Sequence, residues 1–266
     1  MADATTAHLA EFIVHTKTED LPPEVAANGV RAFLNWVGCT LGGATHPAAR
    51  TAFDAAVEFA GAPTATLFGR GKHLDAINTA YINCIASAAH AYDDTHLSTV
   101  IHPTGPVASA AFALAERKGA LSGNDLLGAI VIGIETSCQL GHALLIPPAK
   151  GQLGWYMTGV AGAIGAAAAS ARILDLDEQQ TRWALGIAGN QASGYRQTHG
   201  SMCTSFVPGH AARSGMHAAF LAHQGFTASD DALEGNNGFA DVFAFDANLG
   251  SISERLGNIW EIHSNA

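Results

Sequence analysis

Residues 157–171 read MTGVAGAIGAAAASA, an uncharged stretch made almost entirely of Ala and Gly. At about four helical turns it is too short to cross a bilayer, and in water this composition is typical of a helix enclosed on all sides by other helices. The Gly pairs within it indicate close helix packing and not a phosphate-binding loop, because no strand precedes them. The stretch therefore predicts a multi-helix domain with a buried helix inside it.

Helical spacing of apolar residues also dominates the rest of the chain, and almost no stretch alternates with period two. No repeat, low-complexity tract or Ser/Pro linker divides it. We therefore predict one all-α domain spanning residues 1–266, with a single short extended segment at 64–69 and an irregular part from about 229 to 266. The expected helices start at residue 6 and then cover residues 23–41, 48–60, 74–91, 106–117, 123–145, 158–174, 178–188 and 209–225.

Composition and charge exclude several classes of protein. The chain is 48% hydrophobic and only 14% charged, which is too apolar for a disordered tail. Its net charge is −10 and no cluster of Lys or Arg interrupts it, so a nucleic-acid partner is not expected. The four cysteines lie far apart and predict buried free thiols; with no secretory signal at the start, we expect a cytoplasmic protein.

The long apolar run at residues 123–146 is the segment that most resembles a membrane span. It carries too many polar groups for a lipid-facing helix. We therefore expect a core helix of a soluble protein and no membrane partner. The polar residues in the run are Asn124, Asp125, Glu135, Gln139 and His142.

The densest polar cluster is residues 90–105, HAYDDTHLSTVIHPTG. It joins a buried-looking helix to one that starts near Pro106, and loops at helix ends often carry chemistry. Burial would raise the pKa of whichever of Asp93 and Asp94 faces inward, and His102 is a candidate acid or base near neutral pH. The alternative is a structural loop whose polar side chains cap two helix ends.

The same cluster also suggests a metal site, with His90 and Asp94 four residues apart and His96 or His102 as a further ligand. No ligand spacing of a dedicated metal site is present, and a capping or hydrogen-bonded histidine explains the pattern as well. We expect neither a metal nor another cofactor.

A second polar region, residues 194–215, reads GYRQTHGSMCTSFVPGHAARSG. Arg196 or Arg213 could bind a carboxylate through two hydrogen bonds, and His199 or His210 could polarise one. Arg213 is equally well explained as a surface arginine. Cys203 has no neighbouring base in the sequence and is expected to be a packed thiol.

At these regions the sequence resembles the MmgE/PrpD family, whose members include 2-methylcitrate dehydratase, cis-aconitate decarboxylase and iminodisuccinate epimerase. The resemblance implies an all-helical, usually dimeric core domain followed by a smaller α+β lid, and cofactor-free proton abstraction beside a carboxylate. It rests on six pieces in order: AHAYDDT (89–95), HPTGP (102–106), GWYMT (154–158), ALGIAGNQASG (184–194), residues 215–227 and EGNNGF (234–239).

Carried over by position, Asp93 and His102 fall on the active-site aspartate and histidine of the family. Tyr156 stands where a His is common, and Thr204 stands where a Lys is common. The missing Lys weakens a dehydratase or decarboxylase assignment, whereas Tyr156 can still donate or accept a proton. An epimerase or an altered lyase therefore stays open.

We therefore expect a lyase or epimerase that acts on a small di- or tricarboxylate and works as a homodimer. The alternative is a non-catalytic dimerisation subunit or partial enzyme that needs a second chain for its lid, because relatives continue beyond the end of this chain into that domain. The chain is then a fragment, a split-gene product or a short relative. The expected catalytic residues are His102, Asp93 and Tyr156, and the expected substrate contacts are Asp94, Thr95, Thr104, Arg196, His199 and Thr204.

Overall fold

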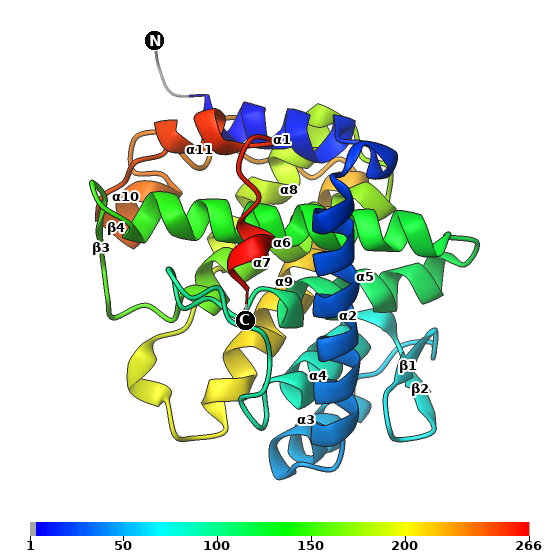
Figure 1. Cartoon of the computed structure of the whole chain (residues 1–266). Helices are drawn as coiled ribbons and strands as arrows, with labels where there is room; N and C mark the ends of the chain where they lie inside the picture. The colour runs from blue at the N-terminus through cyan, green and yellow to red at the C-terminus, as the bar shows by residue number, and fades with distance from the viewer. Residues whose placement is uncertain (1–3, 266) are drawn as a thin grey trace.

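The computed structural model describes residues 4–265 and places the Ala/Gly-rich helix α7 (Met157–Ile173) at the centre of a helical domain (Figure 1). Every residue of α7 except Arg172 is buried. The predicted enclosed helix and the all-α class are thus confirmed. The helices with the most extensive packing against α7 are α5 (Thr104–Lys118), α6 (Gly123–Leu145), α8 (Glu178–Gln191) and α9 (Cys203–His223).

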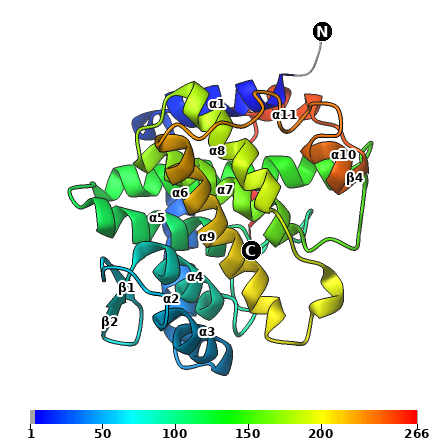
Figure 2. The same ribbon diagram turned by 180° about the vertical axis from the view of Figure 1, so that it is seen from behind.

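The remaining elements surround this centre. Helix α2 crosses one side of the domain in Figure 1, and α9 crosses the opposite side in Figure 2. The outer helices are α1 (Thr5–His15), α2 (Pro23–Gly43), α3 (Pro47–Val57), α4 (Ala76–Ser87), α10 (Phe239–Phe243) and α11 (Gly250–Arg255), with 3₁₀ turns η1 (Thr18–Asp20), η2 (Arg196–Thr198) and η3 (Glu261–Ser264). The strands form two antiparallel pairs, β1 (Ala65–Leu67) with β2 (Lys72–Leu74) and β3 (Lys150–Gly151) with β4 (Ala244–Asp246).

Local capping sets the starts of two of the central helices. The Ser122 hydroxyl accepts a hydrogen bond from the Asp125 amide at the start of α6. Asp177 and Gln180 form a reciprocal capping box at the start of α8. Each cap satisfies amide groups that have no partner within the helix.

The sequence prediction places the start of α9 six residues too late, at residue 209. The helix begins at Cys203 and contains Pro208. Pro208 removes only one backbone hydrogen bond near the helix start. Packing of α9 against α7, α8 and α4 supplies more stabilisation than this loss. The C-terminal part, predicted to be irregular, also contains α10, α11 and β4.

Helix α6 passes a length and composition test for a membrane span, but 83% of its most apolar window is buried inside the domain. It contacts α7, α5 and α2 and holds Glu135 at 1% exposure. These contacts are typical of a core helix.

Candidate active site

The loop between α4 and α5 holds His102 in a fixed orientation. The imidazole Nδ1 lies 3.1 Å from the carbonyl oxygen of Asp94 and 3.1 Å from the hydroxyl of Thr95. Because a carbonyl oxygen only accepts hydrogen bonds, Nδ1 carries the proton of the neutral ring. Nε2 is then the basic nitrogen, and His102 lines a pocket.

Asp93 lies on the same side of the ring as these acceptors. Its Oδ2 is 3.9 Å from Nδ1 of His102, and its side chain is only 6% exposed. Burial raises the pKa of Asp93, and the positive charge of a protonated His102 partly offsets this rise. The Asp93 carboxylate therefore lies where it can stabilise the positive charge that the ring acquires when Nε2 accepts a proton.

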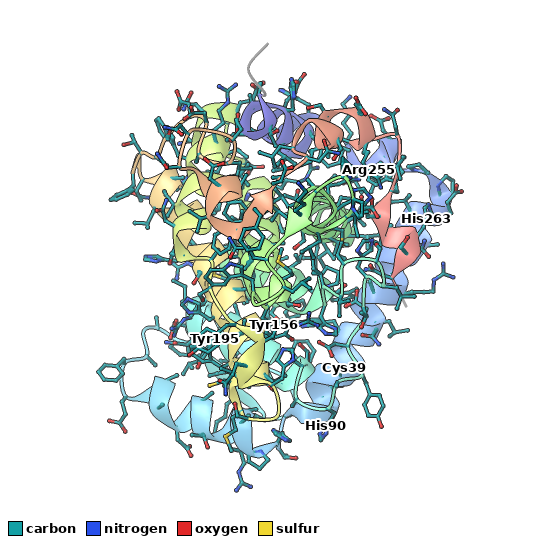
Figure 3. All side chains as sticks on the ribbon, turned by 90° about the vertical axis from the view of Figure 1, so that its left-hand side faces the viewer. Cys39, His90, Tyr156, Tyr195, Arg255 and His263 are labelled. Atoms are coloured by element: carbon teal, nitrogen blue, oxygen red, sulfur yellow. The ribbon has the colours of Figure 1, made fainter. Side chains whose placement is uncertain are left out.

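Two segments about forty residues apart bring the other expected groups to His102. The Tyr156 amide donates to the carbonyl of Gly194 at 3.0 Å, and the Arg196 amide donates to the carbonyl of Gly154 at 2.9 Å. Gly194 has a φ of +104°, and a Cβ there would lie 2.5 Å from a methyl carbon of Val207, so glycine is required. Figure 3 shows Tyr156 beside Tyr195 on this face.

The pocket between these segments measures about 190 Å³. The Tyr156 ring centroid is 6.5 Å from that of His102 and 4.6 Å from that of His199, so three rings form one wall. The Arg196 side chain lines the same pocket. A base, a phenol and a guanidinium therefore face one small space.

Tyr156 is held as a proton donor. Burial raises its pKa well above the ordinary value, and the negative charge of Asp93 raises it further. Hydrogen bonding with Thr158 and the charge of Arg196 only partly offset this rise. The phenol thus remains protonated near neutral pH and can donate to an oxygen or carbon of a bound acid.

Four of the six expected substrate contacts do not line this pocket. The Asp94 carboxylate is 6% exposed and accepts hydrogen bonds from the Thr104 hydroxyl at 2.6 Å and the Asn265 amide at 2.9 Å. Burial raises the pKa of Asp94 to about 6, although the Thr104 hydrogen bond lowers it. The Thr204 hydroxyl instead accepts from the Gly200 amide at 3.1 Å.

Thr95 also lies outside the lining, but it touches the site through its contact with His102. Arg213 is placed elsewhere: its guanidinium lies over the Tyr81 ring at 4.6 Å and its Nε donates to His210. Cys203 is exposed at the start of α9, so the prediction of a packed thiol is wrong there.

The helical spacing behind the alternative metal site is absent. Helix α4 ends at Ser87, so His90 and Asp94 do not share a helix face, and His90 is exposed while Asp94 is buried. Within residues 4–265, no group of three or more His, Cys, Asp or Glu side chains is arranged to hold a metal ion.

The apolar part of the pocket wall was not predicted from the sequence. Two of its residues are at helix ends and three are in connecting segments. Single apolar residues at such places carry no pattern that marks them as pocket residues. These wall residues are Val100, Leu145, Ile146, Leu153 and Met157.

A larger hollow of about 710 Å³ lies beside the pocket, and Trp155 lines both. Among the described residues of its lining, Asp231 is the one with an ionisable side chain. Size alone favours this hollow, but the groups able to move protons are in the smaller pocket, which we therefore take as the candidate active site.

Comparison of the sequence with known protein families assigns this chain to one of them. Residues 7–251 match the MmgE/PrpD N-terminal domain. The chain belongs to the MmgE/PrpD family. The matched region contains both segments that form the pocket, and it confirms the resemblance found in the sequence.

Curated relatives of this MmgE/PrpD protein include cis-aconitate decarboxylases. The Aspergillus terreus enzyme is 29% identical over 244 residues, which cover 90% of this chain and 50% of the relative. The human enzyme is 29% identical over 253 residues, covering 92% and 51%. The mouse enzyme is 32% identical over 190 residues, covering 68% and 38%. The chain thus spans about half the length of the curated relatives it matches, and these relatives are lyases.

Proposed function

We propose that this chain carries the proton-transfer groups of a cofactor-independent lyase of the decarboxylase or dehydratase type, acting on a small di- or tricarboxylate. The observation that carries the proposal is the single pocket shared by His102, Tyr156 and Arg196. Arg196 and His199 bind a substrate carboxylate, as a guanidinium suits a planar carboxylate. Cis-aconitate, the acid in the names of the relatives, is the first candidate.

The chemistry follows from the protonation states. In elimination, Nε2 of His102 removes the proton beside the carboxylate, and the electron pair of that C–H bond forms the double bond as the leaving group departs with a proton from Tyr156. In decarboxylation, the C–C bond to one carboxylate breaks, CO₂ leaves, and the electron pair left on carbon takes a proton from the Tyr156 phenol, which becomes a phenolate. Asp93 stabilises the charged ring whenever His102 holds the extra proton.

Solvent exchange tests this proposal. The full chain is incubated with cis-aconitate and a panel of di- and tricarboxylates in deuterated buffer, and the acids are followed by NMR. We expect deuterium incorporation, a new alkene or loss of a carboxylate for at least one acid. Unchanged spectra for every acid would instead support the non-catalytic subunit.

We further propose that the chain associates as a homodimer through apolar surface. On α2, Val30, Leu34 and Leu41 lie along one side of the helix and are 53%, 68% and 50% exposed. Exposed apolar stripes of this kind are typical of association sites. With a net charge of −10 on each copy, like charges oppose the contact, so salt should not weaken it.

Light scattering at micromolar concentration, with and without 1 M NaCl, measures this association. We expect a mass of at least twice 27.4 kDa under both conditions. A clean monomer contradicts the proposal, and dissociation confined to high salt shows an electrostatic interface instead.

A further inference from the structure

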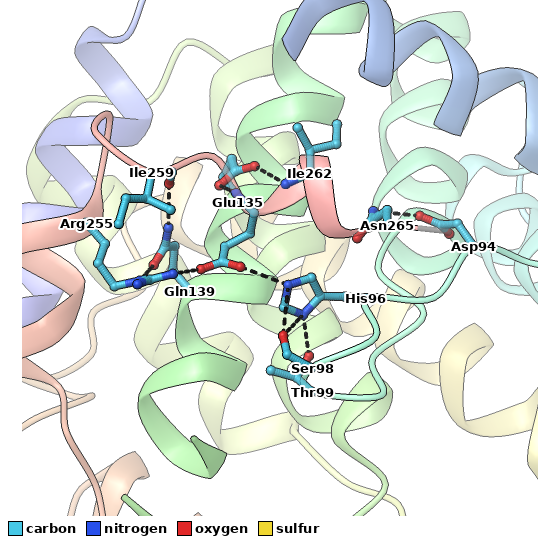
Figure 4. A network of polar contacts seen from close by, with 11 residues as sticks. Asp94, His96, Ser98, Thr99, Glu135, Gln139, Arg255, Ile259, Ile262 and Asn265 are labelled. Carbon is cyan, nitrogen blue, oxygen red and sulfur yellow. Dashed lines mark hydrogen bonds and ion pairs between the residues drawn. The ribbon is translucent and has the colours of Figure 1, made fainter. Parts of the chain in front are cut away.

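A chain of buried polar contacts joins the middle of α6 to the loop that carries His102, through the 3₁₀ turn η3 (Figure 4). The Glu135 carboxylate accepts hydrogen bonds from the backbone amides of Glu261 at 2.9 Å and Ile262 at 2.8 Å. Glu135 is 1% exposed. Helix α6 therefore fixes the position of η3 through the main chain of η3 itself.

The side chain of Glu261 continues the contact to the loop. Its Oε2 lies 2.8 Å from Nε2 of His96, whose side chain is fully buried. The other ring nitrogen of His96 lies 2.6 Å from the Thr99 hydroxyl. The His96 ring thus ties the loop to η3.

The backbone of His96 forms the turn that ends at His102. Its amide donates to the Ile101 carbonyl at 2.8 Å, and its carbonyl accepts from the Val100 amide at 2.8 Å. Val100 has a positive φ of +55°, a conformation that costs a β-branched residue free energy and persists only where surrounding contacts hold it. His102 follows directly after this turn.

A second contact, from the residue after η3, reaches Asp94, which contacts His102 directly. The Asn265 amide donates to Oδ2 of Asp94 at 2.9 Å, and the carbonyl of Asp94 is the acceptor for Nδ1 of His102. The end of the η3 segment therefore contacts both the turn before His102 and the residue that fixes its tautomer.

The neighbours of Glu261 stabilise its charged form. Burial alone would raise the pKa of Glu261, but hydrogen bonds from His96 and Arg255 more than offset it, and the pKa lies below its ordinary value. Arg255 also donates to Gln139 of α6 at 3.2 Å. Apolar side chains of similar size would stabilise a core about as well as such buried ion pairs, so a requirement for defined geometry explains the arrangement better than stability does.

We propose that Glu261 and His96 are positioning residues for His102, holding its loop so that Nδ1 meets the Asp94 carbonyl and Nε2 faces the pocket. Neither side chain lines the pocket, so both act through the loop. The inference rests on the proposed function for its kinetic consequence, but the orientation of His102 can be measured without any substrate.

Glu261→Ala removes the carboxylate that holds His96, and Glu261→Gln keeps an oxygen that can accept from it. Glu178→Ala is the matched control, because Glu178 forms a second His–Glu pair, with His15 at 2.8 Å, that is exposed and lies outside the pocket. Imidazole ¹⁵N NMR reports the tautomer of each histidine. The His102 signals are those that disappear in His102→Gln.

We expect wild type and Glu178→Ala to show His102 with the proton on Nδ1, and Glu261→Ala to show a mixture of tautomers. Glu261→Gln should restore most of the single tautomer. With an active acid, kcat of Glu261→Ala should fall by about 10- to 100-fold while KM changes less than about twofold, because a displaced base slows the reaction without removing substrate contacts.

A folded Glu261→Ala protein with the wild-type His102 tautomer overturns the positioning role, whatever its activity. If Glu261→Ala does not fold, His96→Gln is judged by the same criteria. An inactive wild type with the predicted tautomer changes in the variants contradicts the proposed function and supports the positioning of His102. Unchanged kcat in an active Glu261→Ala enzyme contradicts the inference alone.

Discussion

Replacing His102 by Gln is expected to lower kcat by about 10²- to 10⁴-fold while the melting temperature hardly moves. Glutamine keeps an amide N–H that can donate to the Asp94 carbonyl, so the loop loses little of its stabilising hydrogen bonding. It cannot take or give a proton at the position of Nε2. The His102 side chain is 23% exposed, so its replacement leaves no large cavity.

Two quantities are measured for each protein. They are kcat on the acid identified by solvent exchange, and the melting temperature from thermal unfolding followed by circular dichroism. His73→Gln is the control, since His73 is exposed on β2 and lies outside the pocket lining. A large loss of stability, with activity per folded molecule preserved, would show that His102 is a structural loop residue.

Helical periodicity was sufficient to predict most of the fold, because each element shows its own pattern. The spacing at residues 178–188 and the caps at Ser122 and Asp177 are local signals, and the structure has them. The start of α9 was missed because Pro208 is a local breaker signal that long-range packing overrides.

Prediction of the pocket residues required information other than helical periodicity. His102, Tyr156 and Arg196 are separated by about forty to ninety residues, and no spacing rule brings them together. Chemistry identified His102 and Arg196, and position in a family pattern supported His102 and identified Tyr156. The apolar residues of the pocket wall were marked neither by a family pattern nor by reactive side chains. Asp94 and Thr104 were grouped with the site by closeness in sequence, but they bind each other.

The Glu135, Glu261 and His96 contacts could not be predicted for the same reason. They join three segments far apart in the chain, and each contact depends on where η3 crosses α6. The one sequence signal was a carboxylate in the middle of an apolar run, since a buried Glu needs partners. Burial raises the pKa of Glu135 to about 8, even though the η3 amides lower it.

Close packing of α7 against α9 depends on Gly215, which is buried on α9. A Cβ at this position would lie 2.3 Å from the carbonyl oxygen of Ala163 and 2.6 Å from the amide nitrogen of Ala167. Both atoms belong to the backbone of α7, so no side-chain rotation can relieve the contact. The two helices must move apart to admit even one methyl group.

Gly215→Ala is therefore expected to lower the free energy of unfolding by about 3 kcal/mol, at the upper end of the usual cost of overpacking. For a domain of this size that corresponds to a fall in Tm of roughly 6–12 °C. Gly38→Ala is the matched control, since Gly38 is an exposed position of α2 with no atom within 4 Å of the added Cβ. Helix propensity predicts that this change stabilises the protein by up to about 1 kcal/mol. Urea unfolding at one protein concentration measures both variants. Equal stability of Gly215→Ala and the wild type would mean that α7 and α9 are less tightly packed than these distances show.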